Sequence, residues 1–382
     1  MTRILLAPDK FKGSLTALQV TDALRDGMLS ADPSLGIESL PVADGGDGTV
    51  AAAVSAGWEP VEVSCHGPTG LPVETSYARR GTSAVVELAS AVGLELVDSL
   101  DPLGASTFGL GTVMAHALSA GADHIVLGLG GSASTDGGAG MLQALGARIQ
   151  GADGNDVARG GGALRGATRL DASGLHPALR RARIQLACDV DNPLLGPTGA
   201  SAVYGPQKGA GPQDLLHLDH AMKQWAHVVR SAIGRDLSGV AGAGAGGGTG
   251  FGALAVLGAD VRPGIGTVLD LIEFHRRLAS ADLVVTGEGS LDEQSLHGKA
   301  PIGVALAARS AGVPVVAVSG RRTVGTDTLR EYGVVDSYTL SDLEPDTAAS
   351  MRDAADLLRR IGEFIALSPV VRSTIHTSEG VS

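Results

Sequence analysis

The stretch "RILLAPDKFKGS" (residues 3–14) joins a short run of apolar residues to a polar loop that contains glycine. An apolar run of this length that ends abruptly in turn residues is typical of a buried β-strand. Similar runs recur along the chain: "HIVLGLG" (124–130), "RIQLACD" (183–189), "DLVVTGEG" (282–289) and "PVVAVSG" (314–320). Because helical stretches separate these runs, the sequence predicts parallel α/β layers with polar loops at the carboxyl ends of the strands.

Two helices and a change of pattern are visible between these runs. Thr16 and Gln19 have the spacing of a capping box, and apolar residues then follow at helical spacing. Residues 212–233 repeat apolar positions in the same way and predict a second, longer helix. Residues 61–96 instead read as short alternating strands around Gly/Pro turns, so we expect a second domain to begin near residue 60.

The composition excludes several classes of protein. A chain of 382 residues with 44% hydrophobic residues can build two domains with their own cores. A net charge of −12 and only 3% aromatic residues argue against nucleic acid as a partner. Two cysteines, Cys65 and Cys188, give no disulfide framework and no CxxC metal pair. The sequence shows no secretory signal and no apolar run of membrane-spanning length, so we expect a soluble, cytoplasmic protein with no membrane contact.

The segment "IVLGLGGSASTDGG" (125–138) is a buried strand that runs into glycines and hydroxyl residues. Backbone N–H groups and hydroxyls of this kind are suited to binding phosphate oxygens, although a plain strand-to-helix turn would have the same composition. The segment "AGAGAGGGTG" (241–250) also matches a GxGxxG pattern. No predicted strand precedes it, so we do not interpret it as a dinucleotide-binding fingerprint.

Three loops place carboxylates where a ligand could bind. "PVADGGDGTV" (41–50) sets Asp44 and Asp47 around paired glycines, which could equally be a turn stabilised by its own side chains. "LACDVDNPLLG" (186–196) places Asp189 and Asp191 just after a strand, a position suited to a general base or a magnesium ligand, or to a simple turn before proline. "VVTGEGSLDEQSLHGKAP" (284–301) ends a strand in the same way at Glu288, and it does not match a Walker A motif.

Lysine is rare in this chain, with five residues against 24 arginines. Four of the five lysines lie on polar or Gly/Pro loops, whereas Lys223 lies on the predicted helix at 212–233. A lysine ammonium is a compact point charge with rotatable donors, which suits contact with a phosphoryl group that moves during transfer. The sequence contains neither a GxSxG nor an HExxH motif, so hydrolysis by a catalytic triad and zinc proteolysis have no support.

Seven segments together resemble the type I glycerate kinase family and occur in the family's order from residue 7 to about residue 320. They are "APDKFKGSLTA", "ADGGDGT", "GLGGSASTDGGAGMLQALGA", "ACDVDNPLLGPTGA", "YGPQKGA", "GAGGGTGFGAL" and "TGEGSLDEQSLHGKAPIGVA". The glycine segment departs from the family's more usual "GAAGG". The resemblance implies ATP-dependent phosphorylation of D-glycerate, commonly at the 2-hydroxyl group, with Mg²⁺. It also implies a Rossmann-like parallel-sheet domain formed by both chain ends (1–60 and 275–382) with a second α/β domain inserted (61–274), as a monomer or homodimer.

Phosphoryl transfer depends on positioning and on neutralising charge, which assigns expected roles to the loop residues. Asp189 is the expected general base, and Asp191 and Glu288 are the expected magnesium ligands. The remaining expectations are Lys10 and Lys12 as catalytic cations; Gly130, Gly131, Ser132 and Ser134 as donors to the nucleotide; and Asp44, Asp47, Ser14, Lys208 and Lys299 in substrate binding.

Other functions share parts of this pattern. A glycerate 3-kinase, or a kinase for another small hydroxy acid, would need the same types of residue. An NAD(P)-dependent dehydrogenase would share the α/β architecture, but its glycine fingerprint should stand directly after the first strand, where "PDKFKGS" is found. "GLGGSAS" also resembles the phosphate loop of the GHMP kinases, which have a different α+β fold, and a non-catalytic binding module is a further alternative.

Overall fold

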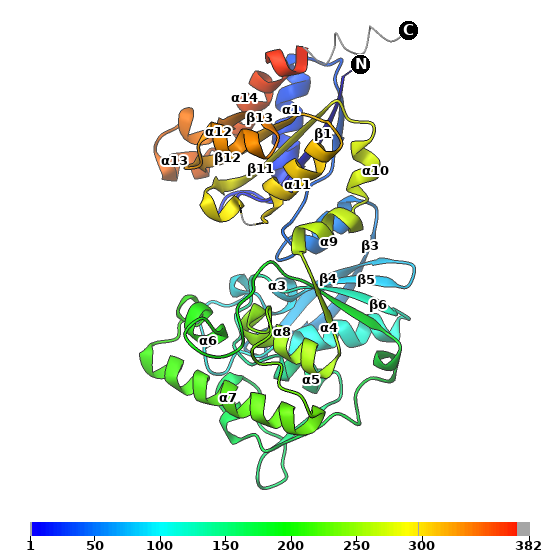
Figure 1. The fold of residues 1–382 in the computed structure, drawn as a ribbon, viewed down its shortest axis with the longest axis vertical. Coiled ribbons are helices and arrows are strands. Elements are labelled where there is room, and N and C mark those ends of the chain that lie inside the picture. The colour runs from blue at the N-terminus through cyan, green and yellow to red at the C-terminus, as the bar shows by residue number, and fades with distance from the viewer. Residues whose placement is uncertain (1, 297, 373–382) are drawn as a thin grey trace. The chain divides into compact units, whose positions relative to one another are not determined.

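The computed structural model of the chain describes residues 2–296 and 298–372. Its internal contacts divide these residues into two compact units. The terminal unit contains the described residues up to Asp44, Ala51–Ala56, and those from Ile265 onward, and the inserted unit contains Gly45–Val50 and Gly57–Gly264. Figure 1 shows the blue N-terminal and the yellow-to-red C-terminal segments within the same unit. The prediction of an α/β fold in which both chain ends form one parallel sheet is therefore confirmed.

A five-stranded, wholly parallel sheet forms the centre of the terminal unit, in the order β13-β12-β11-β1-β2. Strand β1, which lies between β11 and β2, is buried from Ile4 to Pro8, as its apolar sequence predicts. It pairs with β11 in a register that sets Leu5 beside Val284. The strands are β1 (Arg3–Pro8), β2 (Gly36–Ser39), β11 (Leu283–Leu291), β12 (Val315–Arg322) and β13 (Val334–Thr339).

Helices α1 and α14 pack closely against one another in the terminal unit (Figure 1). Helix α1 begins with the predicted capping box of Thr16 and Gln19. An added Cβ atom on Gly27 of α1 would lie 1.9 Å from the carbonyl oxygen of Arg359, so only glycine allows this approach. The α-helices are α1 (Ala17–Ala31), α10 (Phe274–Leu278), α11 (Ala300–Ser310), α12 (Thr326–Glu331), α13 (Thr347–Arg352) and α14 (Ala354–Leu367), with 3-10 helices η5 (Glu293–Leu296) and η6 (Leu340–Asp342). Two further helices cross the division between the units: α2 (Thr49–Ser55) and α9 (Gly264–Leu271), of which only Gly264 belongs to the inserted unit.

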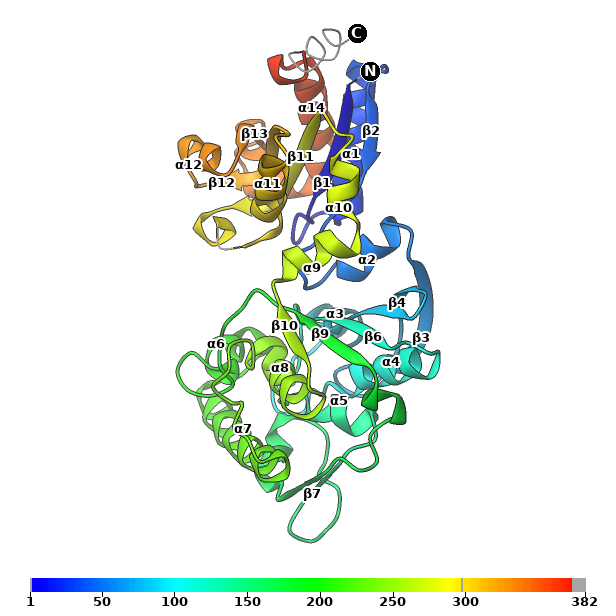
Figure 2. The same ribbon diagram turned by 45° about the vertical axis from the view of Figure 1, so that its right-hand side comes forward.

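The inserted unit is built on a six-stranded mixed sheet in the order β10-β9-β6-β5-β4-β3. Strands β10, β9, β6 and β5 are parallel, whereas β4 and β3 are antiparallel to their neighbours, as the hairpin pattern at residues 61–96 predicts. Figure 2 shows β10, β9 and β6 side by side. The strands are β3 (Glu59–His66), β4 (Pro72–Arg80), β5 (Ser83–Glu87), β6 (His124–Gly128), β9 (Arg183–Ala187) and β10 (Asp260–Arg262), with a separate pair β7 (Arg148–Gln150) and β8 (Arg169–Asp171).

The longest helix of the inserted unit, α7, covers the predicted range Pro212–Ile233. Its apolar face is core, with Trp225 fully buried and its indole N–H donating to the Gly137 carbonyl oxygen. The glycines of residues 151–170 predict an irregular loop or a lid, but this stretch contains a 3-10 helix and the start of a short strand. Leu164 and Leu170 are buried in the core, so the stretch is part of the packed unit. The helices are α3 (Leu88–Val92), α4 (Phe108–Ser119), α5 (Ala139–Ala144), α6 (Ala200–Tyr204), α7 and α8 (Ala245–Val256), with η1 (Leu94–Leu96), η2 (Gly161–Gly166), η3 (Pro177–Arg180) and η4 (Pro206–Lys208).

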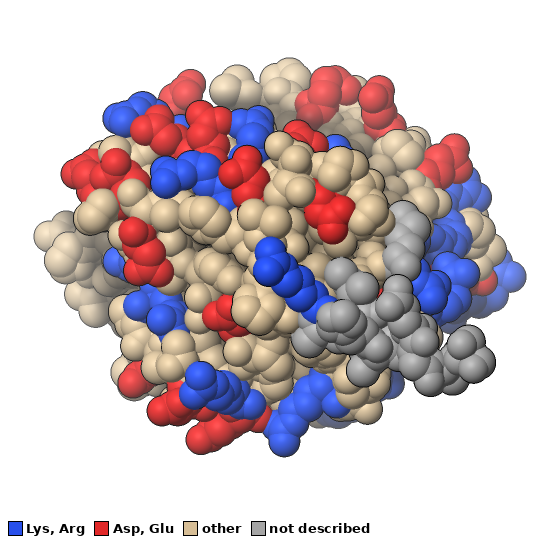
Figure 3. Space-filling view, turned by 90° about the horizontal axis from the view of Figure 1, so that it is seen from above, with Lys and Arg blue, Asp and Glu red and all other residues tan. Residues whose placement is uncertain are grey.

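The described residues on the face drawn in Figure 3 present acidic and basic side chains interspersed. Neither sign forms a continuous field over the described residues of this face. Within residues 2–296 and 298–372, no helix has both the length and the apolar character needed to cross a membrane.

Candidate functional site

The carboxyl ends of three neighbouring strands define one edge of the inserted unit. Strand register places Glu87 of β5 beside Gly128 of β6, and Gly128 beside Ala187 of β9. Because parallel strands end at the same edge, the loops that follow them come together there, and open α/β sheets bind ligands at such edges. The glycine loop (residues 129–135) follows β6, and the acidic loop (residues 188–192) follows β9.

A second glycine-containing segment, residues 45–50, packs directly on the glycine loop. An added Cβ atom on Gly130 would lie 2.7 Å from the Gly46 Cα atom, and one on Gly131 would lie 3.7 Å from the Cβ atom of Asp47. Glu87 fixes this segment, because its Oε2 atom accepts hydrogen bonds from the N–H groups of Gly48 and Val50, each 3.1 Å long. The structure thus brings three of the predicted residues, Asp47, Gly130 and Gly131, into one place.

Asp189 lies exposed just beyond the end of β9. Its Oδ1 atom accepts a 2.7 Å hydrogen bond from the Gly264 backbone N–H, so its carboxylate is held at the edge of the sheet. Gly264 in turn lies next to Gly45, since a Cβ atom on Gly45 would be 2.5 Å from the Gly264 Cα atom. Asp191, two residues further along the acidic loop, is also exposed. A base at Asp189 would therefore belong to the same edge as the glycine loop.

Lys208 occupies the interior behind the glycine loop. Its side chain is 2% exposed, and its Nζ atom donates to Ser132 Oγ at 2.7 Å and to the Ser134 carbonyl oxygen at 2.5 Å. Burial lowers the pKa of Lys208 to about 7, an effect that the carboxylate of Asp136 opposes. Ser134 is completely buried, and its hydroxyl has no hydrogen-bond partner among the described residues. The hydroxyl of Ser132 is therefore hydrogen-bonded to the Lys208 ammonium group, whereas the hydroxyl of Ser134 is not.

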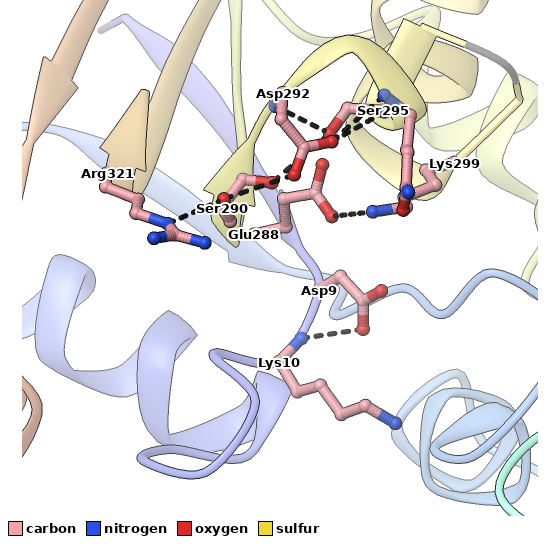
Figure 4. Close-up of polar contacts among 9 residues, drawn as sticks. Asp9, Lys10, Glu288, Ser290, Asp292, Ser295, Lys299 and Arg321 are labelled. Carbon is pink, nitrogen blue, oxygen red and sulfur yellow. Dashed lines mark hydrogen bonds and ion pairs between the residues drawn. The ribbon is translucent and has the colours of Figure 1, made fainter. Parts of the chain in front are cut away.

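The corresponding edge of the terminal unit carries an acidic cluster, shown in Figure 4. Asp9 follows β1, and its Oδ1 atom accepts a 2.6 Å hydrogen bond from the backbone N–H of Lys10. Burial, and then the nearby charge of Asp44, raise the pKa of Asp9 to about 8. Burial also raises the pKa of Glu288, whose Oε2 atom lies 3.7 Å from Lys299 Nζ. The cluster therefore holds buried carboxyl groups whose charged forms are disfavoured.

Three other predicted residues of the terminal unit follow strand β1 and lie in different environments. Figure 4 shows the Lys10 side chain extending away from Glu288. Lys12 is exposed on the loop after β1. Ser14 donates its hydroxyl to the Met351 carbonyl oxygen at 2.6 Å, which ties this loop to helix α13. Ser14 therefore has a hydrogen-bonding role within the unit itself.

The two predicted magnesium ligands lie in different units, Glu288 in the terminal unit and Asp191 in the inserted unit. Within the part of the chain that the structure describes, no group of three His, Cys, Asp or Glu side chains is arranged to hold a metal ion. Glu288 is nevertheless 8% exposed, and its Oε1 atom has no hydrogen-bond partner among the described residues. Mg²⁺ commonly takes one or two carboxylates together with phosphate oxygens and water, and Glu288 fits such a role.

Sequence reasoning did not single out two residues that the structure places in these sites. Asp9 is the first polar residue after the first buried strand, so its position alone could have marked it. Asp136 lies within the quoted glycine segment, but only the fold shows that its carboxylate is buried among backbone N–H groups.

The sequence pattern of the glycerate kinase family matches residues 4–368 of the chain. The chain belongs to the glycerate kinase family. A glycerate kinase from Halalkalibacterium halodurans is 41% identical over 96% of this chain and 98% of its own length. A glycerate 2-kinase from Escherichia coli strain K12 is 40% identical over 95% of this chain and 97% of its own length. A crystal structure of a protein assigned as glycerate kinase 2 from Salmonella typhimurium LT2 is 41% identical and superimposes with a TM-score of 0.82, with both chains covered completely.

Membership of the glycerate kinase family makes this protein an enzyme of the kinase class and confirms the resemblance seen in its seven segments. The relatives are matched over almost their full length, so the family relationship applies to both units. The dehydrogenase alternative receives no support from these comparisons.

Proposed function

We propose that the protein transfers the γ-phosphoryl group of ATP to the 2-hydroxyl group of D-glycerate, producing 2-phosphoglycerate and ADP. The observation that carries the proposal is the family match over residues 4–368, which includes the glycine loop at the carboxyl edge of the inserted sheet. The name of the Escherichia coli relative, glycerate 2-kinase, supports the choice of hydroxyl group. The use of ATP and the two free cysteines, Cys65 and Cys188, support a cytoplasmic location. We further propose that the protein is a monomer or a homodimer.

In the inserted unit, we assign the nucleotide phosphates to the glycine loop. Gly130 and Gly131 have no side chains of their own to cover their backbone N–H groups, and Ser132 adds a hydroxyl that accepts a hydrogen bond from Lys208. Ser134 supports the loop from behind through its carbonyl oxygen. Because the site must bind a polyanion, this combination of backbone donors over a buried cation is chemically suitable.

Asp189 is our proposed general base. Its exposure allows contact with a substrate hydroxyl, and the hydrogen bond from Gly264 fixes the direction of the carboxylate. A base in this position would orient the glycerate hydroxyl and accept its proton as the bond to phosphorus forms. Asp47, which lies beside Gly131, is proposed to bind a hydroxyl group of the substrate.

In the terminal unit, we assign cations and acidic groups to the anionic parts of the substrates. Lys10, Lys12 and Lys299 can neutralise the glycerate carboxylate or phosphate oxygens, and Asp44 can accept a hydrogen bond from a substrate hydroxyl. Ser14 is proposed to act in substrate binding by holding the Lys12 loop in place through its bond to Met351. Bound Mg²⁺ would neutralise phosphate charge, and Glu288 is the proposed protein ligand in this unit. In the inserted unit, the proposed protein ligand is Asp191.

The test is a coupled assay that follows ADP release when the purified protein is given ATP, Mg²⁺ and D-glycerate. We expect turnover that depends on both ATP and D-glycerate, with L-glycerate as a matched control for the stereochemistry of the site. ADP release that is unaffected by adding D-glycerate would refute the proposal. Reduction of NAD(P) in a separate incubation with D-glycerate and NAD(P), without ADP release in the first assay, would instead support a dehydrogenase.

A further inference from the structure

We propose that Lys208 and Asp136 are positioning residues that hold the glycine loop (residues 129–135) in the shape that binds nucleotide phosphates, with Lys208 acting through its positive charge. The inference rests on the proposed function, since it takes the glycine loop as the nucleotide site. Lys208 is 2% exposed and Asp136 is 0% exposed, so we assign neither of them a direct contact with a substrate.

Lys208 contacts the glycine loop at two points from a distant part of the chain. It lies at the end of η4, 76 residues after Ser132, and its ammonium group donates to Ser132 Oγ and to the carbonyl oxygen of Ser134. The two bonds hold the residues on either side of Ala133. A charged donor makes such hydrogen bonds shorter and stronger than neutral ones, so loss of the charge should loosen the loop.

The segment "AGAGAGGGTG" (241–250) places Gly247 against the Lys208 ammonium group. Three successive glycines, Gly246–Gly248, have positive φ, and the middle one, Gly247, has φ +68°. An added Cβ atom on Gly247 would lie 2.8 Å from Lys208 Nζ and 2.0 Å from the Ser134 carbonyl oxygen. At this position, only glycine therefore leaves room for the lysine.

Asp136 directly follows the last residue of the glycine loop and fixes that end of it through hydrogen bonds. Its carboxylate accepts hydrogen bonds from the backbone N–H groups of Thr107 at 2.7 Å, Gly138 at 3.1 Å and Gly140 at 3.2 Å, and from the Thr107 hydroxyl. Thr107 Oγ1 in turn accepts a hydrogen bond from the N–H of Met141. The start of α4 and the start of α5 are thereby joined to the end of the glycine loop.

Burying an ammonium group costs free energy, and a neutral side chain of similar size would avoid that cost. Among the described residues, the groups that face Lys208 are the Ser132 hydroxyl, the Ser134 carbonyl, the backbone of Gly247 and one titratable group, Asp136. Burial raises the pKa of Asp136, and the hydrogen bonds from Thr107, Gly140 and Gly138 oppose that effect. Burial lowers the pKa of Lys208 to about 7, so the group loses its charge within the range in which enzymes are assayed. A bound polyphosphate would favour the charged form, which makes nucleotide affinity depend on this titration.

The experiment compares the equilibrium dissociation constant of ATP for the parent protein with that for Lys208→Met, at pH 6 and at pH 8.5, by isothermal titration calorimetry. The ratio of the two constants cancels the titration of ATP itself. We expect ATP to bind at least about 10-fold more weakly to the variant at pH 6, and the ratio to fall toward one at pH 8.5 as the parent loses its charge. The KM for D-glycerate should change by less than about twofold.

A second variant and a matched control complete the design. Lys208→Gln keeps a polar donor at this position and should show the same loss at pH 6, whether or not Lys208→Met folds. Lys223→Met, on the exposed side of α7 where Lys223 pairs with Asp219, should match the parent at both pH values. The inference is overturned if the ATP dissociation constant of the Lys208 variant divided by that of the parent is near one at pH 6, or if this ratio does not fall at pH 8.5. If the parent itself shows no ATP binding and no glycerate-dependent ADP release, the proposed function fails instead.

Discussion

The backbone of Gly130 lies against the backbone of Gly46, so closely that an added Cβ atom on Gly130 would be 2.7 Å from the Gly46 Cα atom. The glycine loop and residues 45–50 therefore fit together only while position 130 has no side chain.

Gly130→Ala should displace the glycine loop and raise the KM for ATP by about 10-fold or more, since 1.4 kcal/mol of lost binding corresponds to that factor. Steady-state kinetics with each substrate varied in turn would measure it, and the KM for D-glycerate should change little. Gly166→Ala is the matched control, because an added Cβ atom there has no neighbour within 4 Å. An ATP KM that is the same for both variants would contradict the close contact as a feature of the nucleotide site.

Asp189→Asn should lower turnover by about 100-fold or more, the usual scale for loss of a general base. The amide oxygen of asparagine can still accept the hydrogen bond from Gly264, so the melting temperature and the affinity for ATP should stay close to those of the parent. Turnover would be measured by ADP release and affinity by calorimetry. Near-normal turnover in this variant would remove Asp189 from the proposed mechanism.

Lys12→Arg should melt at the parent temperature and yet lose most of its turnover. Lys12 is exposed, so a longer side chain meets no packing constraint, but a planar guanidinium group cannot follow a moving phosphoryl group as an ammonium group can. Melting temperature and glycerate-dependent ADP release would be measured together, with Lys223→Arg on helix α7 as a control that changes neither. If Lys12→Arg is as active as the parent, the rarity of lysine elsewhere says nothing about chemistry on this loop.

Asp9→Asn should make the protein more stable at alkaline pH. The pKa of Asp9 is raised to about 8, so between about pH 4 and pH 8 the folded state holds a proton that the unfolded state has released. The free energy of unfolding of the parent therefore falls as pH rises through this range, whereas asparagine removes the titration. Urea unfolding at pH 5 and pH 9 should show the variant gaining about 1 kcal/mol or more over the parent between the two values. Parallel pH dependences would show that Asp9 ionises in the folded protein as it does in the unfolded chain.

Features set by neighbouring residues were predictable from the sequence. The capping box at Thr16 and Gln19, the range of α7 and the buried strand β1 all depend on patterns that repeat within a few residues. The bond between Lys208 and Ser132 joins residues 76 positions apart, and no local pattern reports it. The sequence also offered Ser132 and Ser134 as equivalent hydroxyls, whereas the turn of the loop buries the hydroxyl of Ser134 completely.

The acidic cluster of the terminal unit was only partly predictable for a related reason. Glu288 and Asp44 were visible as polar residues near expected strand ends. The raised pKa of Asp9 depends on burial and on charges that come from two other segments of the chain, which only the folded structure brings near.

The central claim is the identity of the product, and nuclear magnetic resonance of the reaction mixture tests it most directly. Phosphorus–proton coupling after incubation with ATP, Mg²⁺ and D-glycerate distinguishes a phosphate on the single C2 proton from one on the two C3 protons. We predict 2-phosphoglycerate, formed in equal amount to ADP. A product phosphorylated at the 3-hydroxyl group, or ADP without any phosphoglycerate, would contradict the proposed function.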